Sequence, residues 1–523
     1  MKIHREGMRS MLRIVKTENG LVQGLPAADP RITSFKGVPF AAPPIGKNRW
    51  RAPQPAESWE GVKKAYEFAP ISMQAPTVID INNIYTREWS VDPEIPMNED
   101  CLYLNVWTPV CTGEERLPVF VWYFGGGLQV GHTAEMEFDG ERIARRGIVV
   151  VTVNYRLNSF GFLCHPEITE EAPASPGNFG HLDQQAGTQW VKRNIAAFGG
   201  DPDNITIGGQ SAGGGSVLSQ LTSPQNEGLF QRVIIESGIV TKLYPGNPMP
   251  VTKQNLKEAE QEGIKFFEYL GVSSLEEARG LNAEYINSKT LEYKKFWGTV
   301  VDDAFCVGNA FELFLENKRW MVPVMMGHTS TEFFSIPMVK TKRELKELAY
   351  SMFGDDSGEY LELCRIEEAD LEEARRLAAV SGIEYAIRIA ALANSAAGTN
   401  TPIYYYNFDA EIPGWDNPGT FHSVDLWFFF ETLAKCWRPF TGKHYDLARQ
   451  MCNYWANFIR TGDPNGKDST GKELPYWDIY TPEAPYGMLF RDKTEFSKTG
   501  PSNMMKFLVN QYFKIPDCKN SNI

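Results

Sequence analysis

The sequence contains a serine in a pattern typical of a catalytic nucleophile. The pentapeptide Gly209-Gln210-Ser211-Ala212-Gly213 has the form Gly-x-Ser-x-Gly, and it lies between a β-branched run at 205–207 and a helix-competent segment at 216–221. In such a sharp strand-to-helix turn the serine takes strained dihedral angles, and small residues are needed on both sides because larger side chains would collide. The pattern therefore predicts that Ser211 presents its hydroxyl for nucleophilic catalysis beside a helix N-terminus.

A serine in this position needs a base that accepts its proton and an acid that orients the base. In the fold built around such a strand-to-helix turn, the order along the chain is Ser, then Asp or Glu, then His. Of the seven histidines, His422 lies in a glycine-containing loop after a predicted strand at 404–408, and Glu332 follows a predicted strand at 323–327. Since sites in open α/β sheets lie beyond the carboxyl ends of the strands, we expect both side chains to meet Ser211.

A run of glycines offers a site for a developing oxyanion. Gly125, Gly126 and Gly127 directly follow an apolar run at 118–124 that is typical of a buried strand. Consecutive glycines allow backbone N–H groups to point into a site without side chains in the way. The run thus predicts an oxyanion-binding loop at the end of a central strand.

Strands and helices alternate around these residues, which predicts an α/β fold with a large, mostly parallel sheet and crossover helices. A hairpin is expected at 12–24, and charge-rich helical segments at about 245–300 and 338–400 are expected to be inserted as a cap in a single catalytic domain, residues 1–523. Strands are predicted at 101–107, 118–124, 148–153, 205–207, 232–237, 323–327 and 403–408. A long helix is predicted at 183–198.

Composition limits the partners and the location of the protein. The 523 residues are 42% hydrophobic and 22% charged, as in ordinary globular proteins, and the net charge of −13 disfavours nucleic acid and anionic membranes as partners. Residues 1–10 do not form a signal peptide and no run of 18 apolar residues occurs, so we expect a cytoplasmic protein without a membrane span. The eight cysteines show no metal-ligand spacing and are expected to be free thiols, with no metal site.

Motifs across nearly the whole chain make this sequence similar to the type-B carboxylesterases, the α/β-hydrolase branch that includes cholinesterases and p-nitrobenzyl esterases. The similarity is carried by Phe35-Lys36-Gly37-Val38-Pro39-Phe40-Ala41-Ala42-Pro43-Pro44, Asn98-Glu99-Asp100-Cys101-Leu102-Tyr103-Leu104-Asn105, Asn154-Tyr155-Arg156, Asn178-Phe179-Gly180, Phe198-Gly199-Gly200-Asp201-Pro202 and Phe458-Ile459-Arg460-Thr461-Gly462-Asp463-Pro464.

The resemblance implies a role for each candidate residue. Ser211 would be the nucleophile, His422 the general base and then acid, and Glu332 the group that orients His422. The further residues that it implies are the oxyanion donors Gly126, Gly127 and Ala212, a supporting hydroxyl at Ser237, and the structural ion pairs Arg49–Glu99 and Arg156–Asp183. Gln210, next to the nucleophile, is expected to be a further supporting residue. It implies a small-molecule ester as substrate and no cofactor.

The sequence departs from the family pattern at several positions. Met73 and Val272 stand near positions where secreted members carry disulfide cysteines, which agrees with a reducing compartment. Gln210 replaces a glutamate found in many relatives, which weakens the case for a cationic choline substrate. Phe124 stands before the glycine run where some hydrolases carry histidine, so we expect apolar support for that loop.

We therefore expect a serine carboxylesterase that hydrolyses esters through an acyl-enzyme, as a monomer or weak homo-oligomer. A feruloyl or other aromatic-acyl esterase and a lactone or carbamate hydrolase are alternatives. The aromatic run Trp427-Phe428-Phe429-Phe430 and Trp297 could line an aromatic acyl pocket or belong to the core. A non-catalytic binding module is the remaining alternative, and the intact Ser/Glu/His set argues against it.

Overall fold

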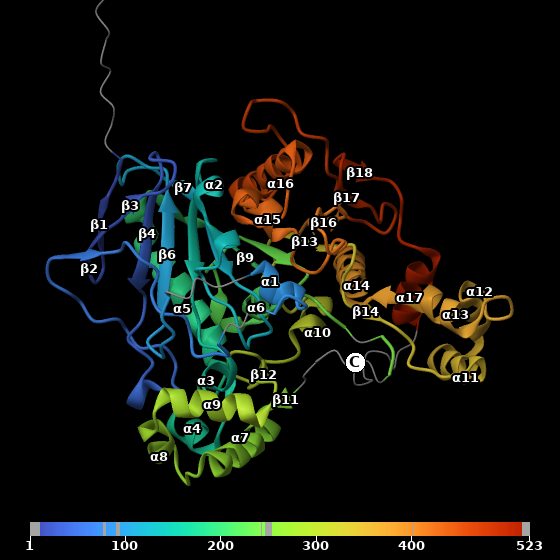
Figure 1. Cartoon of the computed structure of the whole chain (residues 1–523), viewed down its shortest axis with the longest axis horizontal. Helices are drawn as coiled ribbons and strands as arrows, with labels where there is room; N and C mark the ends of the chain where they lie inside the picture. Colours follow the sequence, from blue (N-terminus) through green and yellow to red (C-terminus); the bar gives the residue numbers. More distant parts are fainter. Residues whose placement is uncertain are drawn as a thin grey trace, which may run out of the picture.

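The computed structural model describes residues 11–76, 80–89, 95–241, 243–245, 254–399 and 401–514. Its centre is a twisted eleven-stranded sheet (Figure 1). From one edge to the other its strands are β18 (Glu495–Ser497), β17 (Gly487–Phe490), β16 (Ile403–Phe408), β13 (Val324–Thr329), β10 (Arg232–Glu236), β9 (Gly200–Gln210), β7 (Leu117–Tyr123), β8 (Val149–Val153), β6 (Tyr103–Thr108), β4 (Thr33–Pro39) and β3 (Leu25–Pro26).

The strands from β17 to β8 are parallel to their neighbours, and the strands at both edges are antiparallel. The predicted α/β fold with a large, mostly parallel sheet and crossover helices is therefore confirmed. The predicted hairpin is also present, as β1 (Ile14–Thr17) and β2 (Gly20–Gln23), with β5 (Val62–Lys64) beside it. Two small pairs complete the strands: β11 (Gln254–Asn255) with β12 (Val300–Val301), and β14 (Phe334–Ser335) with β15 (Val380–Ser381).

Helices cover both faces of the sheet because its central strands are apolar on both faces. Along β7, Val119 and Val121 pack in the cluster that includes residues of α5 (Phe179–Asn194), α6 (Ala212–Thr222) and α14 (Gly382–Ala396). The alternating residues Phe120 and Trp122 pack on the opposite face, in the cluster that includes α15 (Leu426–Phe429) and α16 (Gly442–Thr461).

The two segments expected to be helical inserts contain helices in the structure. The first holds α7 (Leu256–Leu270), α8 (Leu275–Gly280) and α9 (Ala283–Tyr293), and the second holds α11 (Lys342–Phe353), α12 (Ser357–Leu363), α13 (Leu371–Ala378) and α14. Figure 1 shows α7–α9 grouped at one end of the molecule, and α11–α13 beside α17 (Asn503–Lys514) at another. Residues 246–253 and 400 of these segments lie outside the described residues, and the division into one domain with a cap stays a prediction.

The remaining helices are short. They are α1 (Ile84–Glu88), α2 (Glu141–Ala144), α3 (Asn158–Phe162), α4 (Pro166–Glu171) and α10 (Ala310–Leu315). Within the described ranges, no helix has the length and apolar character needed to cross a membrane. The seven cysteines in these ranges are free, as predicted, whereas Cys518 and the N-terminal residues 1–10 lie outside them.

Both predicted ion pairs are present and buried. Arg49 Nη2 lies 2.8 Å from Glu99 Oε2, and Arg156 Nη2 lies 2.7 Å from Asp183 Oδ1. Arg49 Nη1 also donates to the carbonyl of Ala278, 3.0 Å away, at the end of α8. Because a buried charge is costly without a partner, Arg49 fixes its segment against α8, and the Arg156–Asp183 pair fixes the segment after β8 against α5.

The turn between β9 and α6 brings three backbone segments into close contact. Ser211 has φ 56° and ψ −126°, and its N–H donates to the carbonyl of Glu236 at the end of β10, 2.8 Å away. A Cβ on Gly213 would lie 2.1 Å from the carbonyl oxygen of Tyr123, and one on Gly209 would lie 2.4 Å from the backbone of Gly213. The predicted need for small residues on both sides of Ser211 is therefore confirmed.

This crowding predicts a difference between two glycine substitutions in the same helix. Gly213→Ala should lower the free energy of unfolding by about 2 kcal/mol or more, because the clash is with backbone atoms that cannot move aside. Gly215→Ala is the matched control, since its Cβ would meet Gly238 O at an ordinary 3.4 Å. Chemical denaturation of both variants tests this, and equal stability of the two would contradict it.

Candidate active site

Ser211 opens onto a cavity of about 940 Å³ at the carboxyl ends of the central strands. The cavity is also lined by the other predicted site residues except Glu332, namely Gly126, Gly127, Gln210, Ala212, Ser237 and His422. Five aromatic side chains also line its wall: Tyr85, Trp89, Phe138, Phe296 and Phe333. The helices of the two inserted segments, α7–α9 and α11–α14, do not line this cavity among the described residues.

Glu332 lies behind His422 and is held by several donors. His422 Nδ1 lies 2.6 Å from Glu332 Oε2. Glu332 Oε1 accepts hydrogen bonds from Ser237 Oγ at 2.6 Å, Thr329 Oγ1 at 3.1 Å and the Thr329 N–H at 3.2 Å. Two strand-end loops thus bring Glu332 and His422 together, as the sequence predicts, and a third supplies Ser237.

The charges of this pair shift the pKa of both groups. Burial by itself would raise the pKa of Glu332, but the charge of His422 and the hydrogen bonds from His422 and Ser237 outweigh it and lower that pKa. Burial would likewise lower the pKa of His422, yet the adjacent Glu332 carboxylate and its hydrogen bond raise it above the ordinary value. The Nδ1 hydrogen bond leaves Nε2 of the neutral ring as the proton-accepting nitrogen.

Gln210 contacts the accepting nitrogen of His422. Gln210 Nε2 lies 3.2 Å from His422 Nε2, and both side chains are buried. The described residues include no hydrogen bond between the side chains of Ser211 and His422, although both line the cavity. Catalytic hydrogen bonds are often long without substrate and tighten in the complex. Donation by the Gln210 amide stabilises the neutral ring of His422 in this arrangement.

The glycine loop leaves backbone donors free at the cavity. Gly126 and Gly127 have φ values of 98° and 66°, which favour glycine. Their N–H groups and that of Ala212, the first residue of α6, donate no hydrogen bond to any described residue. The position of these three residues around Ser211 suits the binding of an oxyanion.

Apolar and amide groups hold this loop in place. Phe124 stacks on Tyr155 with ring centroids 4.2 Å apart, and Tyr155 Oη donates to the Phe124 carbonyl at 2.6 Å. Gln74 binds Gly131 twice, since Oε1 accepts the Gly131 N–H at 2.9 Å and Nε2 donates to its carbonyl at 3.1 Å. The expected apolar support at Phe124 is therefore present, and Gln74 supports the end of the loop.

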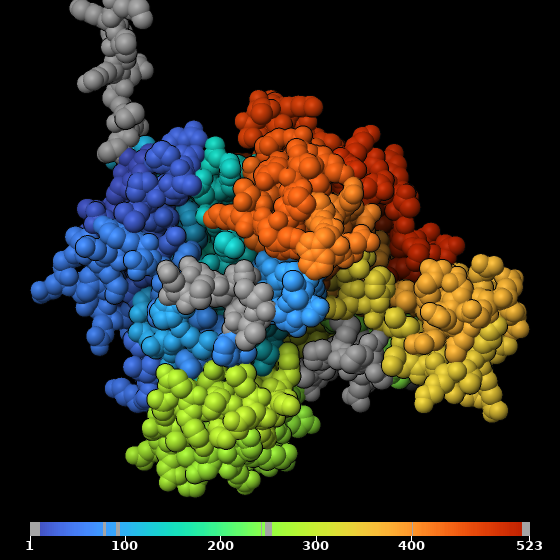
Figure 2. All heavy atoms as spheres, in the orientation of Figure 1, coloured from blue at the N-terminus to red at the C-terminus, as the bar shows by residue number. Residues whose placement is uncertain are grey.

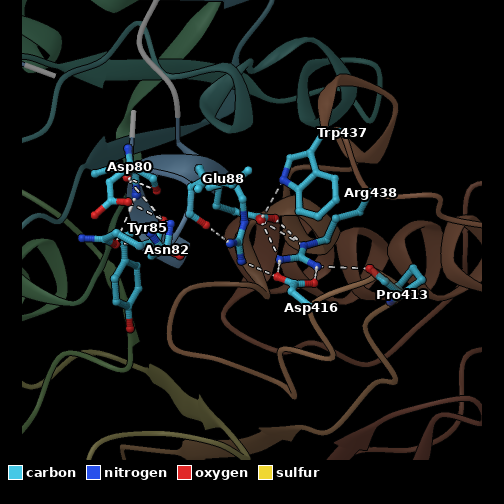
Figure 3. A network of polar contacts seen from close by, with 12 residues as sticks. Asp80, Asn82, Tyr85, Glu88, Pro413, Asp416, Trp437 and Arg438 are labelled. Atoms are coloured by element: carbon cyan, nitrogen blue, oxygen red, sulfur yellow. Dashed lines mark hydrogen bonds and ion pairs between the residues drawn. The ribbon is translucent and has the colours of Figure 1, made fainter. Parts of the chain in front are cut away.

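Helix α1 covers part of the cavity and is fixed by a charged network. Its Tyr85 and the following Trp89 line the cavity, and Trp89 packs edge-on against Phe421 beside His422, with centroids 5.9 Å apart. Figure 3 shows Tyr85 and Glu88 extending from α1 in different directions, with Glu88 bound by Arg438 at 2.9 Å. In the space-filling view, the blue surface at the position of α1 adjoins the orange C-terminal part of the chain (Figure 2).

The aromatic run Trp427–Phe430 belongs to the core and does not line the cavity. Phe429 packs against Phe120 and Phe430 against Trp122, with ring centroids 5.7 Å and 5.1 Å apart. Trp297 is likewise buried, and its neighbour Phe296 is the residue that lines the cavity. Of the two interpretations of these aromatic residues, the core interpretation is confirmed.

Comparison with known proteins assigns the chain to a family. The sequence model of the carboxylesterase family matches residues 12–508 of this chain. The chain belongs to the carboxylesterase family. It is a carboxylic ester hydrolase, as predicted.

Relatives match over most of their length. The fumonisin B1 esterase of Sphingopyxis macrogoltabida is 32% identical, over 86% of this chain and 82% of the relative, and human cocaine esterase is 32% identical, over 92% and 89%. The para-nitrobenzyl esterase of Bacillus subtilis is 31% identical, over 90% and 93%. A solved PNB esterase structure covers 95% of this chain and 99% of its own at 27% identity, with a TM-score of 0.75.

Several residues at the cavity were not predicted from the sequence. They include Gln74, Tyr85, Trp89, Glu135, Glu137 and Phe333. Phe333 adjoins Glu332 in the chain, and its ring centroid lies 4.7 Å from that of His422. Only proximity to a predicted catalytic residue could have indicated Phe333, and no motif marks the others.

The raised pKa of His422 predicts the pH dependence of hydrolysis. The base works when neutral, so kcat/KM should fall as the pH is lowered, with a midpoint above the ordinary histidine value of 6.5. A pH–rate profile with a neutral ester measures this midpoint. A profile that stays flat from about pH 5 to 8 would exclude His422 as the base.

Replacing Gln210 by glutamate should move that midpoint upward by about one unit, because a carboxylate near His422 Nε2 favours the protonated ring. Gln231→Glu is a matched control, since Gln231 lies outside the cavity lining and its Oε1 accepts the Ile205 N–H at 2.8 Å. A midpoint unchanged in Gln210→Glu would show that residue 210 does not act on His422.

Proposed function

We propose that this enzyme hydrolyses carboxylic esters through an acyl-enzyme formed on Ser211, with His422 as general base and acid and Glu332 as the residue that orients it. The observation that carries the proposal is the 2.6 Å contact between His422 Nδ1 and Glu332 Oε2 beside the cavity that Ser211 enters. The strained backbone of Ser211 supports it further, because such strain persists at functional sites.

The proposed reaction uses each group in turn. A side-chain rotation of Ser211 or His422 exchanges the Gln210 contact for one with the serine hydroxyl, and Nε2 takes its proton as Oγ attacks the ester carbonyl. The N–H groups of Gly126, Gly127 and Ala212 then stabilise the oxyanion, each contributing about 3 kcal/mol in the transition state. His422 protonates the leaving alcohol, and water repeats the sequence to release the acid.

The residues of the cavity wall are suited to bind apolar and aromatic substituents on the ester. Five aromatic side chains line it, and they offer both burial of apolar area and offset stacking. The names of the relatives refer to fumonisin B1, cocaine and para-nitrobenzyl esters, so the family match does not select one substrate. We propose small esters with an apolar or aromatic acyl group as substrates.

Removal of the serine hydroxyl should abolish turnover. Ser211→Ala should lower kcat by at least about 10⁴-fold with p-nitrophenyl acetate, butyrate and octanoate and with methyl ferulate, since the variant cannot form an acyl-enzyme. Ser219→Ala is a matched control on the same helix, because Ser219 Oγ only donates to the Gly215 carbonyl at 3.1 Å. Equal rates in wild type and Ser211→Ala would contradict the proposal.

Substitutions of the two residues that hold His422 in place, Glu332 and Ser237, should lower kcat by different amounts. Glu332→Gln should lower kcat by about 10³-fold to 10⁴-fold, because a neutral amide neither fixes the correct tautomer nor stabilises the imidazolium. Ser237→Ala removes one of several donors to Glu332 and should cost about tenfold. Steady-state kinetics with p-nitrophenyl butyrate measures both, and the reverse order would contradict the assignment of Glu332.

A further inference from the structure

One glutamine side chain joins the glycine loop to the inserted segment that contains α7–α9. Gln129, two residues after Gly127, donates from Nε2 to the Gly127 carbonyl at 3.0 Å and to the Trp297 carbonyl at 2.5 Å. Its Oε1 accepts the Trp297 N–H at 3.3 Å. The Gln129 amide therefore bridges the loop that carries two candidate oxyanion donors and the stretch of chain that follows α9.

Trp297 is a fixed anchor because it packs against the helices of the inserted segment. Its side chain is buried, with 2% of its surface exposed. The ring centroid of Trp297 lies 5.0 Å from that of Phe266 in α7 and 6.3 Å from that of Tyr293 in α9. A backbone position held by two helices can restrain the loop to which it is hydrogen-bonded.

The glycine loop has little conformational preference of its own. Gly126, Gly127 and Leu128 have φ values of 98°, 66° and 61°. Glycine adopts positive and negative φ with similar ease, and a positive φ is strained for leucine. Hydrogen bonds from the surrounding structure must therefore hold the loop in this conformation.

Gln129 holds both peptide groups that flank Gly127. Its backbone N–H donates to the Gly126 carbonyl at 3.0 Å, and its side chain donates to the Gly127 carbonyl. The Gly126 carbonyl and the Gly127 N–H belong to one planar trans peptide group and point in opposite directions. Fixing that carbonyl therefore fixes the direction of the Gly127 N–H, which donates to no described residue.

Two further contacts connect the inserted segment with the glycine loop. Asn287 of α9 donates from Nδ2 to the Gln74 carbonyl at 2.8 Å, and the Gln74 side chain holds Gly131. Phe296 lines the cavity, and a Cβ on Gly127 would lie 3.7 Å from its ring. The helices α7–α9 do not line the cavity, yet their segment supports the loop at its edge.

We propose that Gln129 is a positioning residue for the oxyanion donors and that it transmits the support of the inserted segment to the glycine loop. Its side chain supplies the only hydrogen bond that the Gly127 carbonyl accepts from a described residue. Oxyanion donors must lie about 2.7–3.1 Å from the developing charge, so a small rotation of the Gly127 peptide groups weakens them. The role rests on the proposed function.

Removal of the Gln129 amide should slow the reaction and leave substrate binding nearly unchanged. Gln129→Met keeps the length of the side chain and should lower kcat for p-nitrophenyl butyrate by about tenfold or more, with KM within about twofold, because the oxyanion exists only in the transition state. Gln225→Met is the matched control, since Gln225 Nε2 donates to the Ala304 carbonyl at 3.0 Å, outside the cavity lining. A kcat of Gln129→Met equal to that of the wild type would overturn the positioning role.

Two inhibitors distinguish donor positioning from a general change in the cavity. In hexyl trifluoromethyl ketone the carbonyl carbon bonds to Ser211 Oγ, the serine proton passes to His422, and the carbonyl π electrons become the lone pair of an oxyanion. Methyl hexyl ketone has the same chain without the activated carbonyl, so it reports ground-state binding.

Gln129→Met should weaken inhibition by the trifluoromethyl ketone by about the same factor as kcat/KM and change that by methyl hexyl ketone by less than about twofold. Equal weakening of both inhibitors would indicate a disturbed cavity and would overturn the positioning role. Unchanged inhibition by the trifluoromethyl ketone would also overturn it.

The wild type and Ser211→Ala show which proposal fails. Turnover and trifluoromethyl ketone inhibition in the wild type, with both lost in Ser211→Ala, support the proposed reaction. Their absence in the wild type would overturn that reaction and the role of Gln129 with it. Normal behaviour of the wild type together with a Gln129→Met variant that matches it would overturn the role of Gln129 alone.

Discussion

The close approach of three backbone segments at Ser211 is the constraint on which the site depends. Residues Gly209 and Gly213 let β9, α6 and the end of β7 meet at distances that no Cβ could tolerate. This contact fixes Ser211 in its strained conformation and places the start of α6 next to the glycine loop that follows β7. The nucleophile and the candidate oxyanion donors are therefore held in position by the same packing, before any substrate binds.

Several buried charged groups around the site lie in matched sets. Arg49–Glu99, Arg156–Asp183 and the Glu88–Arg438–Asp416 network each bring opposite charges together in buried positions. Glu332 is balanced by His422 and several hydrogen-bond donors. Two pairs of carboxyl groups have no lysine or arginine partner among the described residues: Glu135 with Glu137, which line the cavity, and Glu236 with Asp425, which are fully buried.

The seven strands from β16 to β6 and the proposed catalytic residues could be predicted from the sequence because their signals are local, whereas the edge strands β3, β4, β17 and β18 were not predicted. A buried parallel strand appears as an apolar run, and a residue directly after such a strand lies at the edge where sites form. Glu332 and His422 meet for this reason, although they are far apart in the chain. Strand bounds differed from the predictions by a few residues at most positions, and the start of β9 by five.

The cavity wall could not be predicted, because its residues come from segments without a distinctive pattern. Tyr85 and Trp89 line it only because α1 is tied to Arg438 and Asp416, more than 300 residues later in the chain. The run Trp427–Phe430 has the composition of an aromatic pocket. It belongs to the hydrophobic core because it packs against β7. Gln74 acquires its role through tertiary contacts alone.

Covalent labelling tests the central claim most directly. The enzyme would be treated with diisopropyl fluorophosphate, which reacts with activated serines, and the modified peptide would be identified by mass spectrometry. The account predicts a single adduct on Ser211, formed together with loss of esterase activity, and no adduct in Ser211→Ala. An adduct on another serine that abolishes activity, or full activity after Ser211 has been modified, would contradict it.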